Sequence, residues 1–245
     1  MHDKISPLGS PAPHRYVQGA WATALLQRMA YWVKKLCVSD KKCLDIGCGE
    51  GALLHELGYS GIGVDLNVSR LALAKEKHLQ VMLGDGTQLP FQDAQFQTVI
   101  SMEVLEHVPD MTLMMREVYR VLENDGTWIV SVPNVTLRSR YEMWREKRPY
   151  YCDADEHYRE ITPVEINGFE HRFMLSSDFK ALFQESGFEV VQQDGVRYVF
   201  PQWFSRIPIL QNLLESAKAD RIWSLLPWFR QHPYWIILVL KKNLR

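Results

Sequence analysis

Three glycines at alternate positions, placed directly after a short apolar stretch, constrain this chain more than any other feature. The stretch 43–46 reads Cys-Leu-Asp-Ile, and Gly47, Gly49 and Gly51 follow it. A buried strand that passes into a loop without Cβ atoms leaves backbone against which a ligand can lie closely. The pattern therefore predicts a nucleotide-like cofactor bound at the end of a buried strand.

Strand and helix signals alternate along the chain. The expected strands occupy 42–46, 61–64, 81–83, 98–102, 127–132, 188–192 and 234–240, and the expected helices occupy 51–57, 68–78, 111–122 and 177–186. Repeated strand–helix units with short links form a parallel sheet that helices cover on both faces. We therefore expect an α/β fold of the doubly wound, Rossmann-like kind, with a seven-stranded, mostly parallel sheet and an antiparallel last strand.

We expect one domain over 1–245, with four additions to this sheet. A flexible lead-in is expected at 1–14 and an N-terminal helix at 15–36, where apolar residues recur at helical spacing. The segment 134–174 is rich in aromatic and charged residues and too long for an ordinary connection, so we expect a cap insertion. A second insertion, at 197–233, mixes aromatic with basic residues, which suits a homodimer face, a lid or peripheral membrane contact.

The overall composition excludes several classes of protein. The formal net charge is -1, so no strong nucleic-acid signal exists. No signal peptide is expected, and no uncharged run approaches the roughly 20 apolar residues that a spanning helix needs. The four cysteines lack paired spacing and are interpreted as reduced thiols. The expected localisation is cytoplasmic.

Acidic residues follow or end three of the expected strands. Asp45 lies just before the glycine loop, where an anion would suit a cationic ligand better than a phosphate. Asp65 ends the second strand and could accept hydrogen bonds from both hydroxyls of a ribose. Asp85 follows the third strand, where it could accept a hydrogen bond from an adenine amine. Together these residues favour a positively charged adenosyl ligand.

On these motifs the chain resembles the class I S-adenosylmethionine-dependent methyltransferases, within the methyltransferase type 11 and ubiquinone-biosynthesis O-methyltransferase group. The matching stretches are 44–51 (LDIGCGEG), 63–65 (GVD), 84–91 (GDGTQLPF), 103–108 (EVLEHV) and 120–126 (RVLENDG). The resemblance implies S-adenosyl-L-methionine as cofactor and a small-molecule acceptor, with O-methylation of a hydroxyl expected. The implied cofactor contacts are Asp45, Gly47, Cys48, Gly49, Asp65, Leu66, Asp85, Gly86, Ser101 and Met102.

Two other functions fit parts of the pattern. Gly47, Gly49 and Ala52 satisfy a looser dinucleotide fingerprint, and Asp65 lies near its ribose-binding position, so an NAD-binding oxidoreductase is an alternative. The Asp85 motif disfavours it. A non-catalytic S-adenosylmethionine-binding regulatory or scaffold protein would carry the same cofactor residues.

A second constellation comprises Glu103, Glu106 and His107. If this segment is helical, spacings of three and four residues place all three on one face, where they could bind a divalent metal such as Mg. The resemblance implies that a later histidine completes such a site, with His171 the best match and His157 the alternative. The plainer interpretation is that these residues cap a helix or line the pocket. In either case His107 and His171 are candidate general bases or substrate contacts.

Overall fold

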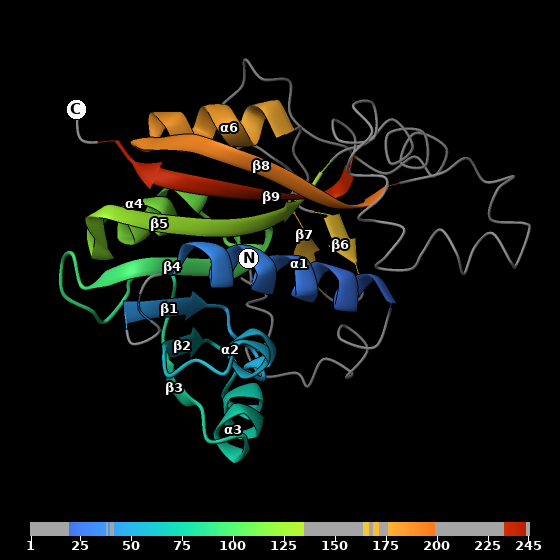
Figure 1. Ribbon diagram of the computed structural model, residues 1–245, viewed down its shortest axis with the longest axis vertical. Coiled ribbons are helices and arrows are strands. Elements are labelled where there is room, and N and C mark those ends of the chain that lie inside the picture. Colours follow the sequence, from blue (N-terminus) through green and yellow to red (C-terminus); the bar gives the residue numbers. More distant parts are fainter. Residues whose placement is uncertain are drawn as a thin grey trace, which may run out of the picture.

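A seven-stranded sheet forms the centre of the molecule (Figure 1). The structure is a computed structural model that describes residues 20–37, 39, 42–134, 164–166, 169–171, 176–198 and 233–243. The helices are α1 (Ala20–Leu36), α2 (Ala52–Leu57), α3 (Val68–Glu76), η2 (Leu105–His107), α4 (Met111–Val121) and α6 (Ser176–Glu185). The strands are β1 (Cys43–Ile46), β2 (Ile62–Asp65), β3 (Gln80–Leu83), β4 (Phe96–Met102), β5 (Leu122–Pro133), β6 (Val164–Ile166), β7 (Phe169–His171), β8 (Phe188–Tyr198) and β9 (Pro233–Lys242).

The strand order of the sheet is β3-β2-β1-β4-β5-β9-β8. Strands β1 to β5 pair in parallel, whereas β9 runs antiparallel to both β5 and β8. The expected fold class, including the antiparallel last strand, is confirmed. The chain reverses its direction of travel across the sheet between β1 and β4. Ligands of open α/β sheets bind at such a switch point, beyond the carboxyl ends of the strands.

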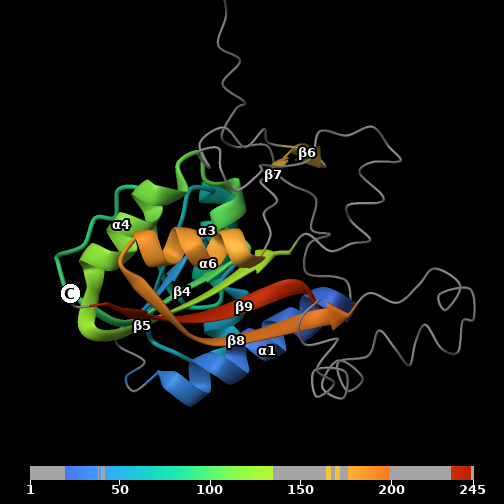
Figure 2. The ribbon, with the colours of Figure 1, turned by 90° about the horizontal axis from the view of Figure 1, so that it is seen from above.

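Helices cover both faces of the sheet. One face packs against α1 and α2 through a cluster that includes Met29, Val33 and Leu53, whereas α4 and α6 cover the other through a cluster that includes Met115 and Phe183. Figure 2 shows α1 on one side of the sheet and α4 with α6 on the other. Helices therefore bury both faces of the middle strands, and the carboxyl ends of the strands are left for ligands.

The helices α3 and α4, which follow predicted site residues, start at side-chain caps. Asp110 accepts hydrogen bonds from the amides of Thr112 and Leu113 and begins α4. Asn67 accepts one from the amide of Arg70 and begins α3. These caps satisfy amides that a helix cannot pair internally. They fix the start of each helix beside a loop that carries predicted site residues.

Two local expectations differ from the structure. The residues 123–126, which were expected to link the helix 111–122 to the strand 127–132, lie inside β5, as an irregularity between its pairing at Leu122 and its pairing at Thr127. β8 continues to Tyr198 rather than ending at 192, because β9 supplies backbone partners along that length.

Most of the expected additions lie outside the described residues. The lead-in 1–14 and positions 15–19 are outside them, as are most of 134–174 and of 197–233. Within the expected cap, the short hairpin β6–β7 is described, and β7 approaches η2. No helix in the described part of the chain is long and apolar enough to cross a membrane.

Candidate cofactor and methyl-transfer site

The loop after β1 is pressed against the neighbouring strand and against the segment after β4. Gly47 has a φ of 70° and its amide donates a hydrogen bond to the Val64 carbonyl at 2.8 Å. A Cβ on Gly47 would overlap the side chain of Val104, and a Cβ on Gly63 of β2 would lie 2.6 Å from the Cys48 Sγ atom. Gly47 is therefore required both by its left-handed backbone and by lack of space, and Gly63 by lack of space alone. This loop sits at the switch point between β1 and β4.

Asp65 is held by the backbone of the same loop. Its Oδ2 atom accepts a hydrogen bond from the Gly49 amide at 2.8 Å, and its Oδ1 atom accepts one from the Asn67 amide at 2.7 Å. Each carboxylate oxygen retains a second lone pair. The carboxylate is therefore fixed in orientation and can still receive the paired hydroxyls of a ribose.

Asp45 is almost fully buried, with 2% of its surface exposed. Burial, followed by the charge of the nearby Asp65 carboxylate, raises the pKa of this carboxyl to about 8. Burial and the same two carboxylates raise the pKa of the Cys48 thiol. Ionisation of Asp45 thus needs a nearby positive charge, which a cationic ligand would supply.

The loop after β3 lies beside the end of β2. The Gly84 amide donates to the Asp65 carbonyl at 3.2 Å. Asp85 is exposed, and its Oδ1 atom accepts hydrogen bonds from both the amide and the hydroxyl of Thr87 at 2.8 Å. Leu66, the residue after Asp65, is 50% exposed. The end of this edge of the sheet therefore presents the Asp85 carboxylate and the apolar side chains of Leu66 and Leu83 to solvent.

The end of β4 directs the side chain of Ser101 into the core. Ser101 is fully buried and its hydroxyl accepts a hydrogen bond from the Trp128 indole at 3.0 Å. Met102 is half-buried and packs against the cluster on the α1 face. A cofactor contact at Ser101 therefore has to use its backbone.

The helix that would align Glu103 with Glu106 and His107 is not formed. Glu103 has a φ of 54°, in the left-handed region, and only Leu105–His107 make a single short turn, η2. The expectation of one helical face is therefore wrong for Glu103. Its amide and its Oε1 atom instead bond to the hydroxyl of Ser131 on β5, at 3.1 Å and 2.9 Å. This link to β5 holds the unusual backbone in place.

The two glutamates still meet, through their side chains. Burial raises the pKa of Glu103 to about 7, although hydrogen bonds with Ser131 and Trp235 act in the opposite direction. Burial, followed by the charge of Glu103, raises the pKa of Glu106 well above its usual range. The Oε2 atom of Glu106 is buried without a hydrogen-bond partner among the described residues, and its Oε1 atom lies 3.8 Å from Nε2 of His107.

The predicted metal site is not supported by the side chains that the structure describes. Among them, no three His, Cys, Asp or Glu residues are placed to hold a metal ion. His171 lies on β7, whose backbone approaches η2, but its side chain is outside the described set, as is all of His157. Burial raises the pKa of both glutamates, so both favour the protonated form, which is a poor metal ligand.

Sequence reasoning missed three contributors to this region. Val104 fills the space above Gly47, Ser131 anchors Glu103, and Arg120 with Glu117 holds the loop after β3. Only the last left a signal in the sequence, namely opposite charges three residues apart on a helix. The other two depend on which strands become neighbours.

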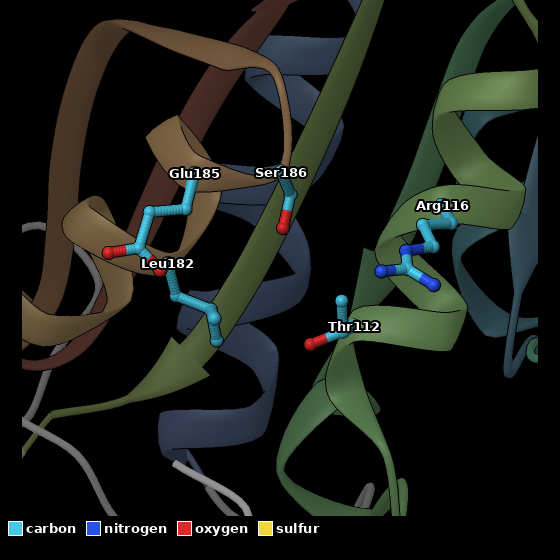
Figure 3. A pocket seen from close by; sticks show the side chains of 5 residues that line it. All are labelled: Thr112, Arg116, Leu182, Glu185 and Ser186. Carbon is cyan, nitrogen blue, oxygen red and sulfur yellow. The ribbon is translucent and has the colours of Figure 1, made fainter. Parts of the chain in front are cut away.

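A separate hollow lies between α4 and α6, and no predicted cofactor residue lines it. Its volume is about 200 Å³, and Thr112 and Arg116 on one wall face Leu182, Glu185 and Ser186 on the other (Figure 3). It is open and small, so it is not the candidate site.

The sequence of this chain matches a known protein family and several relatives. The family described as "Methyltransferase domain" matches residues 14–193. A probable S-adenosylmethionine-dependent methyltransferase of Mycolicibacterium smegmatis is 28% identical over 64% of this chain, and the match spans 56% of that relative's length. A ubiquinone biosynthesis O-methyltransferase of Bartonella quintana is 25% identical over 70% of this chain and 74% of its own.

Solved structures agree on the fold. A Thermotoga maritima protein, described as a SAM-dependent methyltransferase and possible histamine N-methyltransferase, superposes with a TM-score of 0.61. The superposition covers 91% of this chain and 93% of that one at 18% identity. Since the family match extends over residues 14–193, the chain belongs to the methyltransferase-domain family, as its resemblance to the class I S-adenosylmethionine-dependent enzymes predicted.

Proposed function

We propose that this protein binds S-adenosyl-L-methionine at the carboxyl ends of β1, β2 and β3 and transfers its methyl group to the hydroxyl oxygen of a small molecule. The observation that carries the proposal is the carboxylate of Asp65, fixed by the amides of Gly49 and Asn67 beside a loop that has no room for a Cβ. That arrangement fits an adenosyl ligand: a ribose against Asp65 and a chain that passes over the glycines.

Each cofactor residue has a separate task in this proposal. Gly47 and Gly49 let the methionine part approach the backbone, Asp65 accepts from the ribose, and Asp85 with the backbone of Gly86 meets the adenine. Exposed Leu66 offers an apolar surface to the adenine ring. Asp45 becomes ionised close to the cationic part of the ligand. When bound, S-adenosylmethionine supplies an activated methyl group.

The acceptor belongs beside the segment after β4. His107 lies next to Glu106, whose carboxyl group can orient the imidazole, so His107 can take the proton of an acceptor hydroxyl. His171 is a second candidate because β7 approaches η2. The chain holds donor and acceptor in line and excludes water, because charge is neutralised as the methyl group moves. Likeness to an enzyme named for O-methylation supports oxygen as the acceptor atom.

Turnover with a panel of hydroxyl, amine and carbon acceptors tests this function. We expect S-adenosylhomocysteine to form with a hydroxyl acceptor, and mass spectrometry to locate the methyl group on oxygen. Tight cofactor binding without turnover across the panel would favour the scaffold alternative, and a thermal shift with a nicotinamide nucleotide alone would favour the oxidoreductase. Methylation at nitrogen or carbon would overturn the choice of oxygen but keep the enzyme.

His107→Ala tests the base, with His55→Ala on the exposed face of α2 as its matched control. We expect His107→Ala to lower kcat by roughly 100-fold and His55→Ala to leave it unchanged. The metal requirement stays a prediction of the sequence. Turnover that survives a chelator would contradict it, whereas loss and restoration by a divalent ion, dependent on His107, would support it. Localisation, and a membrane or dimer role of 197–233, also stay predictions.

A further inference from the structure

The loop after β3 is fixed to the sheet through its middle. It leads from Gly84 through Asp85 to the start of β4, and its residue Leu89 is 4% exposed within the core on the α4 side. Phe91 packs edge-on against Phe96, with ring centroids 4.8 Å apart. The part that carries Asp85 therefore lies between two anchored ends: the end of β3 and the buried side chain of Leu89.

One ion pair on α4 holds this loop by its backbone. The Oε2 atom of Glu117 accepts a hydrogen bond from the Leu89 amide at 2.7 Å, and the guanidinium of Arg120 donates to the Leu89 carbonyl at 3.0 Å. The same guanidinium donates to the Phe91 carbonyl and to Asp93, each at 2.8 Å. The backbone amide and the backbone carbonyl of Leu89 are thus both hydrogen-bonded to the pair formed by Glu117 and Arg120.

The pair is rigid because its two members also bind each other in a fork. The Nε and NH2 nitrogens of Arg120 donate to the two carboxylate oxygens of Glu117, both at 2.8 Å. Planar, two-pronged pairs of this kind fix direction as well as distance. Hydrogen bonding to Arg120 lowers the pKa of Glu117, so the carboxylate stays ionised.

The residues just before Leu89 are hydrogen-bonded to Asp85. The Gln88 amide donates to the Asp85 carbonyl at 3.0 Å, and Thr87 donates twice to the Asp85 carboxylate at 2.8 Å. The turn 85–88 is therefore closed on itself and attached at residue 89. A shift of Leu89 would move the Asp85 carboxylate with it.

We infer that Glu117 and Arg120 are positioning residues that place Asp85 for the adenine of the cofactor, and so set both the affinity for the cofactor and the preference for adenine. The inference rests on the proposed function, because it takes Asp85 to be the adenine contact. The side chain of Arg120 is 31% exposed and that of Glu117 is 19% exposed, so the pair is partly buried. Leu89 and Phe91 still anchor the loop in the core when the pair is lost, so the loss should show in binding more than in unfolding.

Arg120→Ala and Arg116→Ala form a matched test on one helix. Arg116 is exposed and faces the hollow of Figure 3 rather than the loop. In calorimetry with S-adenosylhomocysteine we expect Arg120→Ala to raise Kd about tenfold or more, and Arg116→Ala to change it less than about twofold. Glu117→Gln should weaken binding in the same direction, since the Leu89 amide then loses a charged acceptor.

A second ligand separates positioning from general loosening. In the inosine analogue of S-adenosylhomocysteine, oxygen replaces the 6-amino group that Asp85 would accept from. The wild type should prefer the adenine form, and Arg120→Ala should lose most of that preference. Equal weakening for both ligands would overturn the positioning of Asp85, as would an Arg120→Ala variant that binds as tightly as the wild type.

Failure of the proposed function gives a different result. A wild type that binds no S-adenosylhomocysteine would overturn the function and this inference together. If Arg120→Ala does not fold, Arg120→Lys replaces it, because lysine keeps the charge and loses the planar fork. Wild-type affinity and wild-type preference in Arg120→Lys would overturn the inference.

Discussion

The Oδ2 atom of Asp65 accepts a hydrogen bond from the backbone amide of Gly49 at 2.8 Å. This bond joins the end of β2 to the glycine loop after β1, so one carboxylate organises the loop and faces the ligand position. A substitution at Asp65 would therefore remove the proposed ribose contact and loosen the loop that carries the other proposed contacts.

Asp65→Ala should weaken S-adenosylmethionine binding by about tenfold or more, since a charged, two-point ribose contact is lost. Isothermal titration calorimetry measures this directly. Asp125→Asn, an exposed aspartate at the far end of β5, is the control and should bind like the wild type. An Asp65→Ala variant with unchanged affinity would remove Asp65 from the cofactor site.

Gly47→Ala should destabilise the fold by roughly 2–4 kcal/mol, because it combines a left-handed residue with an overlap against Val104. Adding Val104→Ala removes the two methyl groups that crowd this position. The double variant should therefore be less destabilised than the sum of the two single destabilisations predicts. Urea unfolding measures the cycle, and strict additivity would show that Val104 does not limit the space above Gly47.

In the absence of cofactor, the free energy of unfolding should fall as the pH rises from the ordinary pKa of Asp45 towards its raised pKa. Its pKa is about 8 in the folded protein against an ordinary 3.8, so the folded state binds this proton more tightly. The stabilisation is complete below the ordinary value and lost as pH rises through 8. Asp45→Asn should flatten the free energy of unfolding between about pH 5 and pH 8. An unchanged slope in this variant would show that Asp45 ionises normally.

Cofactor binding at neutral pH should release a proton from Asp45. A sulfonium close to the carboxyl favours its ionised form, whereas the neutral thioether of S-adenosylhomocysteine does so much less. Titrations of both ligands in two buffers of different ionisation enthalpy give the number of protons released. We expect release with S-adenosylmethionine, less with the product, and little with either ligand in Asp45→Asn. Equal release for the two ligands would separate Asp45 from the sulfonium.

Much of the fold was predictable because local pattern and global order agree in this chain. The strands that end at Ile46 and Asp65 are short apolar runs followed by glycine or a cap, and they became β1 and β2. The antiparallel β9 was expected and is confirmed. The family match confirms the class of protein that the glycines and Asp65 with Asp85 predicted. Their roles at the cofactor stay predictions.

The segment after β4 shows where prediction from the sequence fails. Helical spacing suggested that Glu103, Glu106 and His107 share one face, but Glu103 adopts a left-handed backbone because Ser131 on the neighbouring strand bonds to it twice. The partner of the Ser101 hydroxyl, the Trp128 indole in the core, was also not predictable from local spacing, whereas the cofactor contact of Ser101 stays a prediction. Both outcomes depend on contacts between residues about 28 positions apart, which local spacing does not encode.

The sequence by itself determined the kind of site: glycines where backbone must approach a ligand, and acidic residues at strand ends that favour a cationic adenosyl group. Tertiary structure alone decided how these residues are held. The Asp65 carboxylate bonds to Gly49, Val104 closes the space above Gly47, and Arg120 fastens the loop of Asp85. The physical reason is that residue type sets which interactions a side chain can make, whereas the pairing of strands and helices sets which partner it meets.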